Sequence, residues 1–181
     1  MNASRQKLSR KLISRTQERG SSLIEVMIAS LVLLVGIVPL VGVFGVAVAT
    51  NAGQGDVGTR TALNAQDKME QLMALDFADG TSNTTVYPTA AVGGTGLGGA
   101  MLANSTVGGT NSAAPVAGYV DYLTFQGVLQ TAAAGAMYRR QWSVSTDATG
   151  NLKTITVLVT VPGWSGPGVA PSTRLVCMKT N

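Results

Sequence analysis

The chain has 181 residues, no histidine and a single cysteine, Cys177. These counts exclude a Ser-His-Asp triad, a histidine-ligated metal and a disulfide within the chain. Residues 1–20 carry six of the 13 basic residues but one of the nine acidic residues, so the formal charge of +4 belongs to this segment. The remainder is nearly neutral and lacks the basic stripe of a nucleic-acid-binding protein. The composition therefore favours a non-enzymatic protein with no metal, cofactor, small-molecule substrate or nucleic-acid partner.

An apolar run follows the basic segment. Residues 23–49 contain one charged side chain, Glu25. A helix of this length rises roughly 40 Å at about 1.5 Å per residue, which exceeds a hydrocarbon core of about 30 Å. Because the basic residues precede the run, the N-terminus is expected in the cytoplasm and the C-terminal domain in the periplasm. The run therefore predicts a single-pass span of a bacterial inner membrane, at about residues 23–49.

Three interpretations of this run compete. A secretory signal cleaved after Ala47-Val48-Ala49 would have an apolar region of about 7–15 residues, and this one is much longer. An uncleaved signal anchor fits the length but leaves Glu25 unexplained. Cleavage ahead of the run removes residues 1–20 as a leader and keeps the helix in the mature protein.

The junction between leader and run is Arg19-Gly20-Ser21-Ser22-Leu23-Ile24-Glu25-Val26. It resembles the prepilin signature of type IV pilins. The resemblance implies that prepilin peptidase cuts between Gly20 and Ser21 and methylates the new amine of Ser21, where the family usually has Phe. Glu25 would be the fifth mature residue, the position at which pilin-like proteins keep an acid. The family's model gives Glu25 a role in assembly, through pairing with the amine of a neighbouring subunit.

The position of Glu25 also has a physical rationale. A carboxylate at the centre of a membrane helix costs about 2.5–3.5 kcal/mol, but Glu25 lies only about 6 Å along the axis from the new terminus. An α-amine there is the nearest type of cation that would neutralise it. The alternative is an interfacial acid that the helix dipole favours and that has no role in assembly.

Pro39 lies inside the apolar run, with Gly36, Gly42 and Gly45 around it. Proline removes a backbone hydrogen bond and kinks a helix. Both residue types are tolerated in membrane helices. The resemblance to pilins implies instead a segment that unwinds when subunits pack.

Helical spacing returns over residues 59–75 after a glycine-containing stretch, so the sequence predicts one helix over residues 21–78 with an amphipathic second half. Its apolar stripe comprises Ala62, Ala65, Met69, Leu72 and Met73, and its wetter face comprises Asp67, Lys68 and Glu70. The turn signal Asp79-Gly80 is expected to end the helix.

Residues 79–136 form a connecting region rich in Gly, Thr and Ser, in which residues 80–118 are expected to be a long surface loop. Gly94, Gly96 and Gly99 fit G-x-G-x-x-G, but the strand and helix that a nucleotide site needs are missing. Residues 119–129 are a candidate strand.

Residues 137–181 have the alternation of an antiparallel sheet, with strands predicted at 137–146, 152–161 and 173–179. The apolar face is expected to pack on the helix. Cys177 is expected to be a small core residue, and Arg139 and Arg140 to point to opposite faces. The last 45 residues also loosely resemble minor pilins of the PilV kind.

The predicted fold class is α+β and type IV pilin-like: a long N-terminal helix, membrane-spanning in its first half, packed on a small antiparallel β-sheet. The predicted function is that of a minor pilin, with other pilin subunits, prepilin peptidase and inner-membrane lipid as partners and the pilus at the cell surface as the final location. The alternatives are a pseudopilin of a type II secretion system and a signal-anchored periplasmic binding module.

Overall fold

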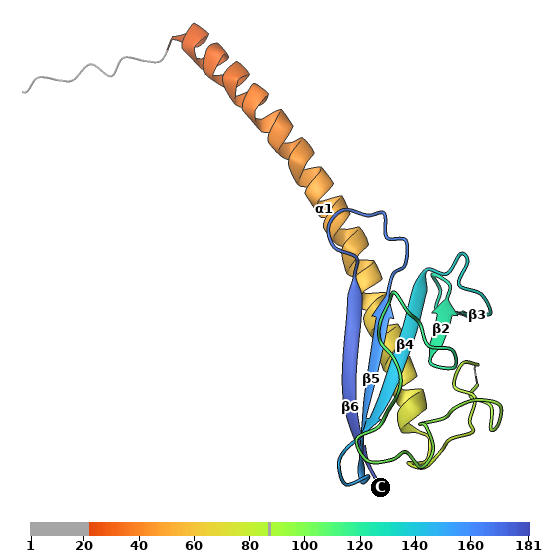
Figure 1. Cartoon of the computed structure of the whole chain (residues 1–181). Helices are drawn as coiled ribbons and strands as arrows, with labels where there is room; N and C mark the ends of the chain where they lie inside the picture. Colours follow the sequence, from red (N-terminus) through yellow and green to blue (C-terminus); the bar gives the residue numbers. More distant parts are fainter. Residues whose placement is uncertain (1–21, 87) are drawn as a thin grey trace, which may run out of the picture. The chain divides into compact units, whose positions relative to one another are not determined.

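The computed structural model describes residues 22–86 and 88–181. The predicted leader and the predicted cleavage between Gly20 and Ser21 lie outside these residues. The chain divides into a first unit that ends at Gly45 and a second unit, Val46–Asn181. One helix, α1 (Leu23–Met73), runs through both units, and the second unit holds the sheet (Figure 1). The strands are β1 (Thr106–Gly108), β2 (Val120–Leu123), β3 (Leu129–Gln130), β4 (Tyr138–Thr146), β5 (Leu152–Thr160) and β6 (Ser172–Thr180).

The helix is assigned without interruption past Pro39 and ends at Met73. It is therefore shorter at its C-terminal end than the predicted 21–78. The chain turns between Met73 and Asp79, where Asp79 N donates to Asp76 O at 3.1 Å. The turn brings the carbonyl of Phe77 within 2.6 Å of Lys153 Nζ. The carbonyl of Met73, the last residue of the helix, accepts a hydrogen bond from Lys179 Nζ of β6 at 2.7 Å. Contacts to the sheet thus hold the chain where the helix ends, before the Asp79-Gly80 signal.

The sheet has the order β3-β2-β4-β5-β6, and β1 also pairs with β4. All pairs are antiparallel. The predicted strands over 137–146, 152–161 and 173–179 agree with β4, β5 and β6 to within about one residue at each end. The alternation of apolar and polar residues predicts these strands well, because each strand has one face toward the helix.

The connecting region is more structured than predicted. It supplies β1, and its candidate strand over 119–129 is found as β2 followed by the start of β3. β2 pairs with the first half of β4, and β1 pairs with residues Ser143–Ser145 on the same edge of that strand. Buried backbone groups need hydrogen-bond partners, and these short strands satisfy the edge of β4 that β5 leaves open.

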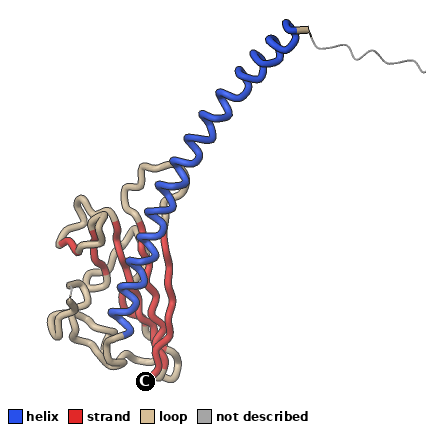
Figure 2. Tube along the Cα trace, turned by 180° about the vertical axis from the view of Figure 1, so that it is seen from behind, coloured by secondary structure: helices blue, strands red, loops and turns tan. Residues whose placement is uncertain are grey.

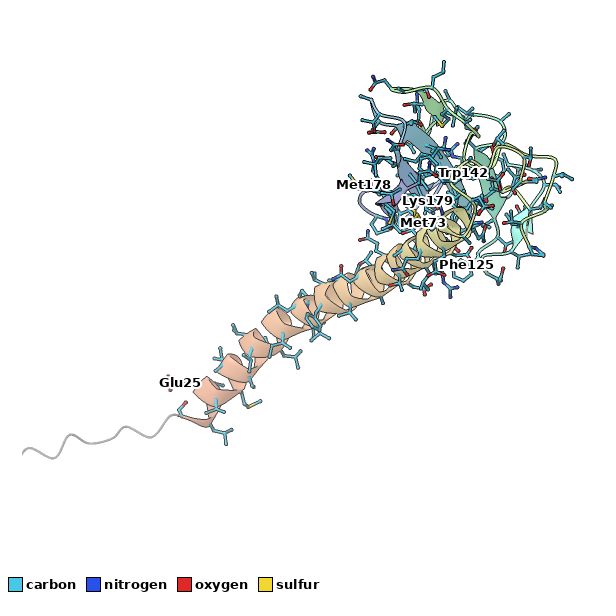
Figure 3. The ribbon with its side chains drawn as sticks, turned by 90° about the horizontal axis from the view of Figure 1, so that it is seen from below. Glu25, Met73, Phe125, Trp142, Met178 and Lys179 are labelled. Atoms are coloured by element: carbon cyan, nitrogen blue, oxygen red, sulfur yellow. The ribbon has the colours of Figure 1, made fainter. Side chains whose placement is uncertain are left out.

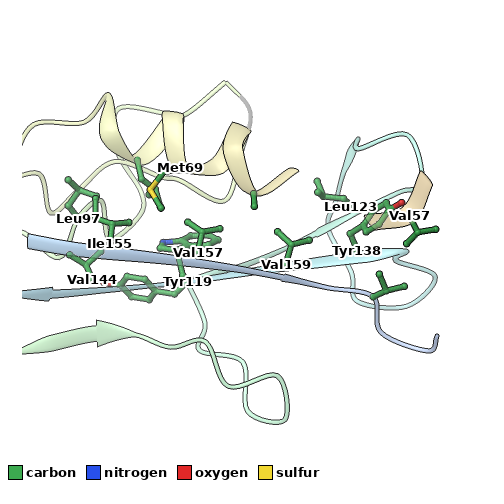
Figure 4. Close-up of a cluster of buried hydrophobic side chains, with 14 residues drawn as sticks. Val57, Met69, Leu97, Tyr119, Leu123, Tyr138, Val144, Ile155, Val157 and Val159 are labelled. Carbon is green, nitrogen blue, oxygen red and sulfur yellow. The ribbon is translucent and has the colours of Figure 1, made fainter. Parts of the chain in front are cut away.

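The core lies between the second half of α1 and one face of the sheet (Figures 2 and 4). Ala65, Met69 and Leu72 are buried, as the predicted stripe requires. The sheet contributes the fully buried side chains of Tyr138, Trp142, Val144, Ile155, Val157 and Val159. The connecting region adds Leu97, which is also fully buried, so residues 80–118 are not simply a surface loop.

The glycines that fit G-x-G-x-x-G allow close backbone packing. A Cβ on Gly94 would lie 2.3 Å from the carbonyl oxygen of Ser82. Gly96 has a φ of +48°, and its Cβ would lie 2.4 Å from a carboxylate oxygen of Asp79. At these contacts the connecting region packs closely against itself. This packing accounts for the glycines, and no nucleotide-binding site is needed to explain them.

Lys153 of β5 holds the connecting region to the sheet. Its side chain is almost fully buried, and Nζ donates to the carbonyls of Phe77, Leu97 and Gly99 at 2.6, 3.1 and 2.7 Å. The ammonium also lies 4.8 Å from the centroid of the Phe77 ring. One cation thus joins the turn after α1 to the buried part of the glycine-rich region.

We predict that Lys153→Met lowers the free energy of unfolding by about 2–3 kcal/mol, because three buried carbonyls lose their charged donor. Urea unfolding of the full chain in detergent micelles, followed by tryptophan fluorescence, measures the loss. Arg174→Met is the matched control, since Arg174 is exposed on β6. Equal losses in both variants would contradict the role of Lys153.

Candidate functional site

The first unit contains the apolar part of α1. The most apolar 18-residue window of this helix has a mean hydropathy of 2.8, and none of the window is buried. By length and composition α1 is able to cross a membrane, a test that a signal sequence also passes. Leu23, Leu33 and Phe44 are 80%, 62% and 71% exposed, so the apolar surface extends along the whole segment. Such a surface requires lipid or other apolar helices around it.

Glu25 is the one predicted assembly residue that the structure places. It lies in the first turn of α1, with an exposed side chain (Figure 3). Its backbone N–H donates to Ser22 O at 2.9 Å, which begins the helix. The predicted processing residues Gly20 and Ser21 lie outside the described residues.

A cluster of four charged side chains, which was not predicted from the sequence, lies between α1 and the sheet. The carboxylate of Asp121 on β2 accepts a hydrogen bond from Lys68 Nζ at 2.6 Å. It also accepts two from Arg140, at 2.8 Å from Nε and 3.0 Å from Nη2. Arg140 Nη1 reaches Asp67 at 2.7 Å. The four side chains join α1, β2 and β4.

The burial of Lys68 corrects a prediction. Lys68 was expected on the wetter face of the helix, but its side chain is fully buried. Its ammonium also donates to Thr84 O and lies 4.0 Å from the centroid of the Trp142 ring. A partner 53 residues away satisfies the charge, and helical spacing carries no information about such a partner. Asp67 and Glu70 are exposed as expected.

Arg140 points into the core and is 2% exposed, whereas Arg139 on the other face of β4 is half-buried. The predicted division between the two faces is confirmed. The aspartate on β2 explains why one of these arginines is buried.

Burial lowers the pKa of Lys68 to about 8, although Asp121 favours its charged form. Burial also disfavours the charge on Arg140, but hydrogen bonds and attraction to Asp121 outweigh it and raise that pKa. Two cations and two carboxylates balance each other here, so the cluster has the chemistry of a structural ion network. Breaking such a network is costly, because it leaves a buried charge without its partner.

Cys177 is only partly buried. It packs against the core from the edge strand β6, opposite Ile155, so it is less enclosed than the expected core residue. Over the two described stretches, no group of three or more Cys, Asp or Glu side chains is placed to hold a metal ion.

No protein-family model matches this chain, and neither a curated protein nor a solved structure matches it.

The lowered pKa of Lys68 predicts a pH dependence of stability. Between pH 8 and about 10.5 the unfolded chain binds more protons than the folded chain, so the free energy of unfolding should rise with pH. The full shift corresponds to at most about 3 kcal/mol. Lys68→Met should remove the part of this rise that Lys68 contributes, while Asp121 keeps Arg140 as its partner. The part from Lys153, whose pKa burial also lowers, should remain.

Urea unfolding at several pH values measures the effect as the difference between wild type and variant, which cancels contributions of other groups. Arg174→Met, at an exposed position of the edge strand β6, serves as the control and should keep the wild-type slope. Parallel stability curves for wild type and Lys68→Met would show that Lys68 does not titrate in this range.

Proposed function

We propose that this chain is a structural subunit of a type IV pilus, of the minor pilin class, and not an enzyme. It is stored in the inner membrane with its N-terminus in the cytoplasm and the residues after the span, from about 50 onward, in the periplasm. Prepilin peptidase then removes residues 1–20, and the mature subunit enters the filament and reaches the cell surface. The observation that carries this proposal is the exposed apolar helix that begins directly after Gly20-Ser21-Ser22.

The exposed apolar surface of this helix supports a segment that can move from lipid into a bundle of other helices. An apolar segment without a buried side chain is stable in lipid, and it is equally stable when other apolar helices surround it. Its second half is instead committed to the sheet through Ala65, Met69 and Leu72. One end of α1 is therefore available for anchoring and assembly, and the other is occupied.

Glu25 is the charged group that such a transfer would use. In the first turn of α1 it lies near the membrane interface, where the cost of a carboxylate is small. In a filament, the α-amine of a neighbouring subunit would form a charge-assisted hydrogen bond with it. The pair would give the apolar helices one defined axial position among several of similar packing energy.

Cleavage after Gly20 is the first test. Mass analysis of the membrane-extracted protein should give a mature chain that begins at Ser21, with or without a methyl group on its amine. Gly20→Leu should leave the full-length precursor in the membrane, because a bulky side chain precedes the scissile bond. Gly36→Leu is a matched control that should be processed normally. A native chain that begins at Thr50 would favour an ordinary secretory signal, and an uncut chain would favour a signal anchor.

The second test concerns Glu25. Glu25→Gln removes the charge but keeps the shape, so insertion and cleavage should persist while the amount in sheared filaments falls at least several-fold. The cleaved subunit should accumulate in the inner membrane. Quantitative immunoblots of the two fractions measure this redistribution.

Glu70→Gln is the matched control, since Glu70 is an exposed acid on the same helix. If Glu25 only interacts with the helix dipole, which is worth about 0.3–1 kcal/mol, the Glu25→Gln variant should reach wild-type levels in filaments. That result would show that Glu25 has no role in assembly. Wild-type protein found only with a type II secretion assembly would identify a pseudopilin.

A further inference from the structure

The loop between β5 and β6, residues 161–171, presents an apolar side chain that the rest of the chain does not cover. Val169 is 91% exposed, more than any other large apolar residue among those that the structure describes. The loop contains no charged residue. Single exposed apolar residues are common on protein surfaces, so the position of Val169 determines what it can contact.

The middle of the loop is held against α1. Gln54 Nε2 of the helix donates a hydrogen bond to Pro167 O. A Cβ on Gly168 would lie 3.1 Å from the same nitrogen, so the loop backbone touches the Gln54 side chain. Figure 1 shows the loop extending past the end of β6 beside the helix. Val169 directly follows Gly168 and therefore lies close to Gln54 along the helix axis.

Contacts within the second unit fix the rest of the loop. Val161 is buried at its start, and Trp164 packs against the core. A Cβ on Gly166 would lie 2.3 Å from the Trp164 ring, so the backbone folds closely over that ring. Just after the loop, the hydroxyls of Thr61 and Thr173 are 2.9 Å apart and join β6 to α1. The fold therefore fixes the exposed position of Val169.

This position lies just beyond the apolar run of α1. Gln54 is five residues after Ala49, the end of the run, which is about 7.5 Å along the helix axis. Residues 46–49 belong to the same compact unit as the loop. The headgroup layer on each side of a hydrocarbon core is about 5–8 Å thick. The placement rests on the proposed function, in which α1 spans the membrane, and Val169 then lies at the level of the lipid headgroups.

The composition of the loop suits this layer. It has no charge to desolvate, and Pro162, Pro167 and Pro171 lack the N–H that would need a partner. Its remaining backbone groups require water or headgroups as partners, which keeps the loop out of the hydrocarbon core. An apolar side chain at this depth is stabilised at the boundary between headgroups and acyl chains. We propose that the β5–β6 loop contacts the lipid surface of the inner membrane, with Val169 as its apolar anchor.

A second copy of the chain matches the loop less well than lipid does. A stable protein interface buries roughly 800 Å² on each partner, and one valine on a short loop rich in glycine and proline offers a small part of that area. Lipid needs no complementary surface. Interfacial anchors set the tilt and rotation of a membrane helix, so this contact restricts the rotation of the folded unit about α1.

Spin labelling of the full chain in vesicles of phosphatidylethanolamine and phosphatidylglycerol tests the contact. A nitroxide is attached to Val169→Cys in a Cys177→Ala background. Power saturation then compares its collisions with oxygen, which concentrates in lipid, and with a water-soluble nickel chelate. The ratio of oxygen to nickel collisions at position 169 should be several-fold higher than at position 92.

Val92→Cys is the matched control. Val92 is an exposed valine two residues before Gly94, whose N–H donates to Thr81 O beyond the end of α1. This end lies about 36 Å along the helix from Ala49. Val46→Cys, within the apolar run, reports the anchoring of the helix itself and should give the highest ratio.

A second measurement removes the apolar contact without a label at position 169. With the nitroxide on Ser165→Cys, an exposed loop position, Val169→Asp should lower the ratio about twofold or more, because a charged side chain leaves the interface. Val92→Asp should leave it unchanged. Both valines are exposed, so neither change removes a core contact.

The outcomes separate this contact from the anchoring of α1. A high ratio at position 46 with equal ratios at 169 and 92 would overturn the loop contact and leave the anchored helix in place. Low ratios at 46 and 169 would overturn both. Dipolar broadening at position 169 with a low ratio would identify a second copy as the occupant, and an unchanged ratio in Val169→Asp would show that Val169 is not the anchor.

Discussion

The carboxylate of Asp121 is the interaction on which the arrangement of the second unit depends. It lies between Lys68 of the helix and Arg140 of β4, and all three side chains are at most 3% exposed. Apolar contacts between a helix and a sheet allow several registers of similar energy. A buried carboxylate with two cationic donors is satisfied in one register only, since any shift along the helix would leave buried charges unpaired. The cluster therefore specifies how the helix lies on the sheet, in addition to whatever net stability it adds.

Lys153 performs a related task for the connecting region. Glycine-rich sequence loses much conformational freedom on folding, and residues 80–118 contain few large apolar side chains with which to offset that loss. Leu97 supplies one buried side chain, and the Lys153 ammonium ties the carbonyls of residues 97 and 99 to β5. The order of this region thus comes from a few strong contacts and from glycines that permit close approach, such as Gly80 against Gly99. The same region contributes Thr85 and Val86 to the lining of a groove beside the ion network.

The two halves of α1 require different surroundings. Residues 23–45 expose apolar side chains on every side, which favours surroundings of lipid or other helices. From Val57 onward one face is buried against the sheet and the other carries charged groups such as Glu70. A subunit that is first anchored and then assembled requires this division, because its folded part must stay intact while its anchor changes partners. The proposed filament role accordingly uses the first half of α1, whereas the ion network and the core belong to the second unit.

Local patterns were sufficient to predict the long helix, its apolar first half and the three long strands. Periodicity along the chain reports which face of an element is buried, and Ala65, Met69, Ile155 and Val157 follow that rule. The junction around Gly20 and Glu25 likewise indicated a processing and assembly site from adjacent residues alone, and that indication remains a prediction. Tertiary structure decided the rest. The end of α1 is held by Lys179 and the turn after it by Lys153. The short strands depend on the free edge of β4, and the burial of Lys68 depends on an aspartate 53 residues away. Each of these features is a contact between distant segments, and the residues that make it differ in no local way from residues that remain in water.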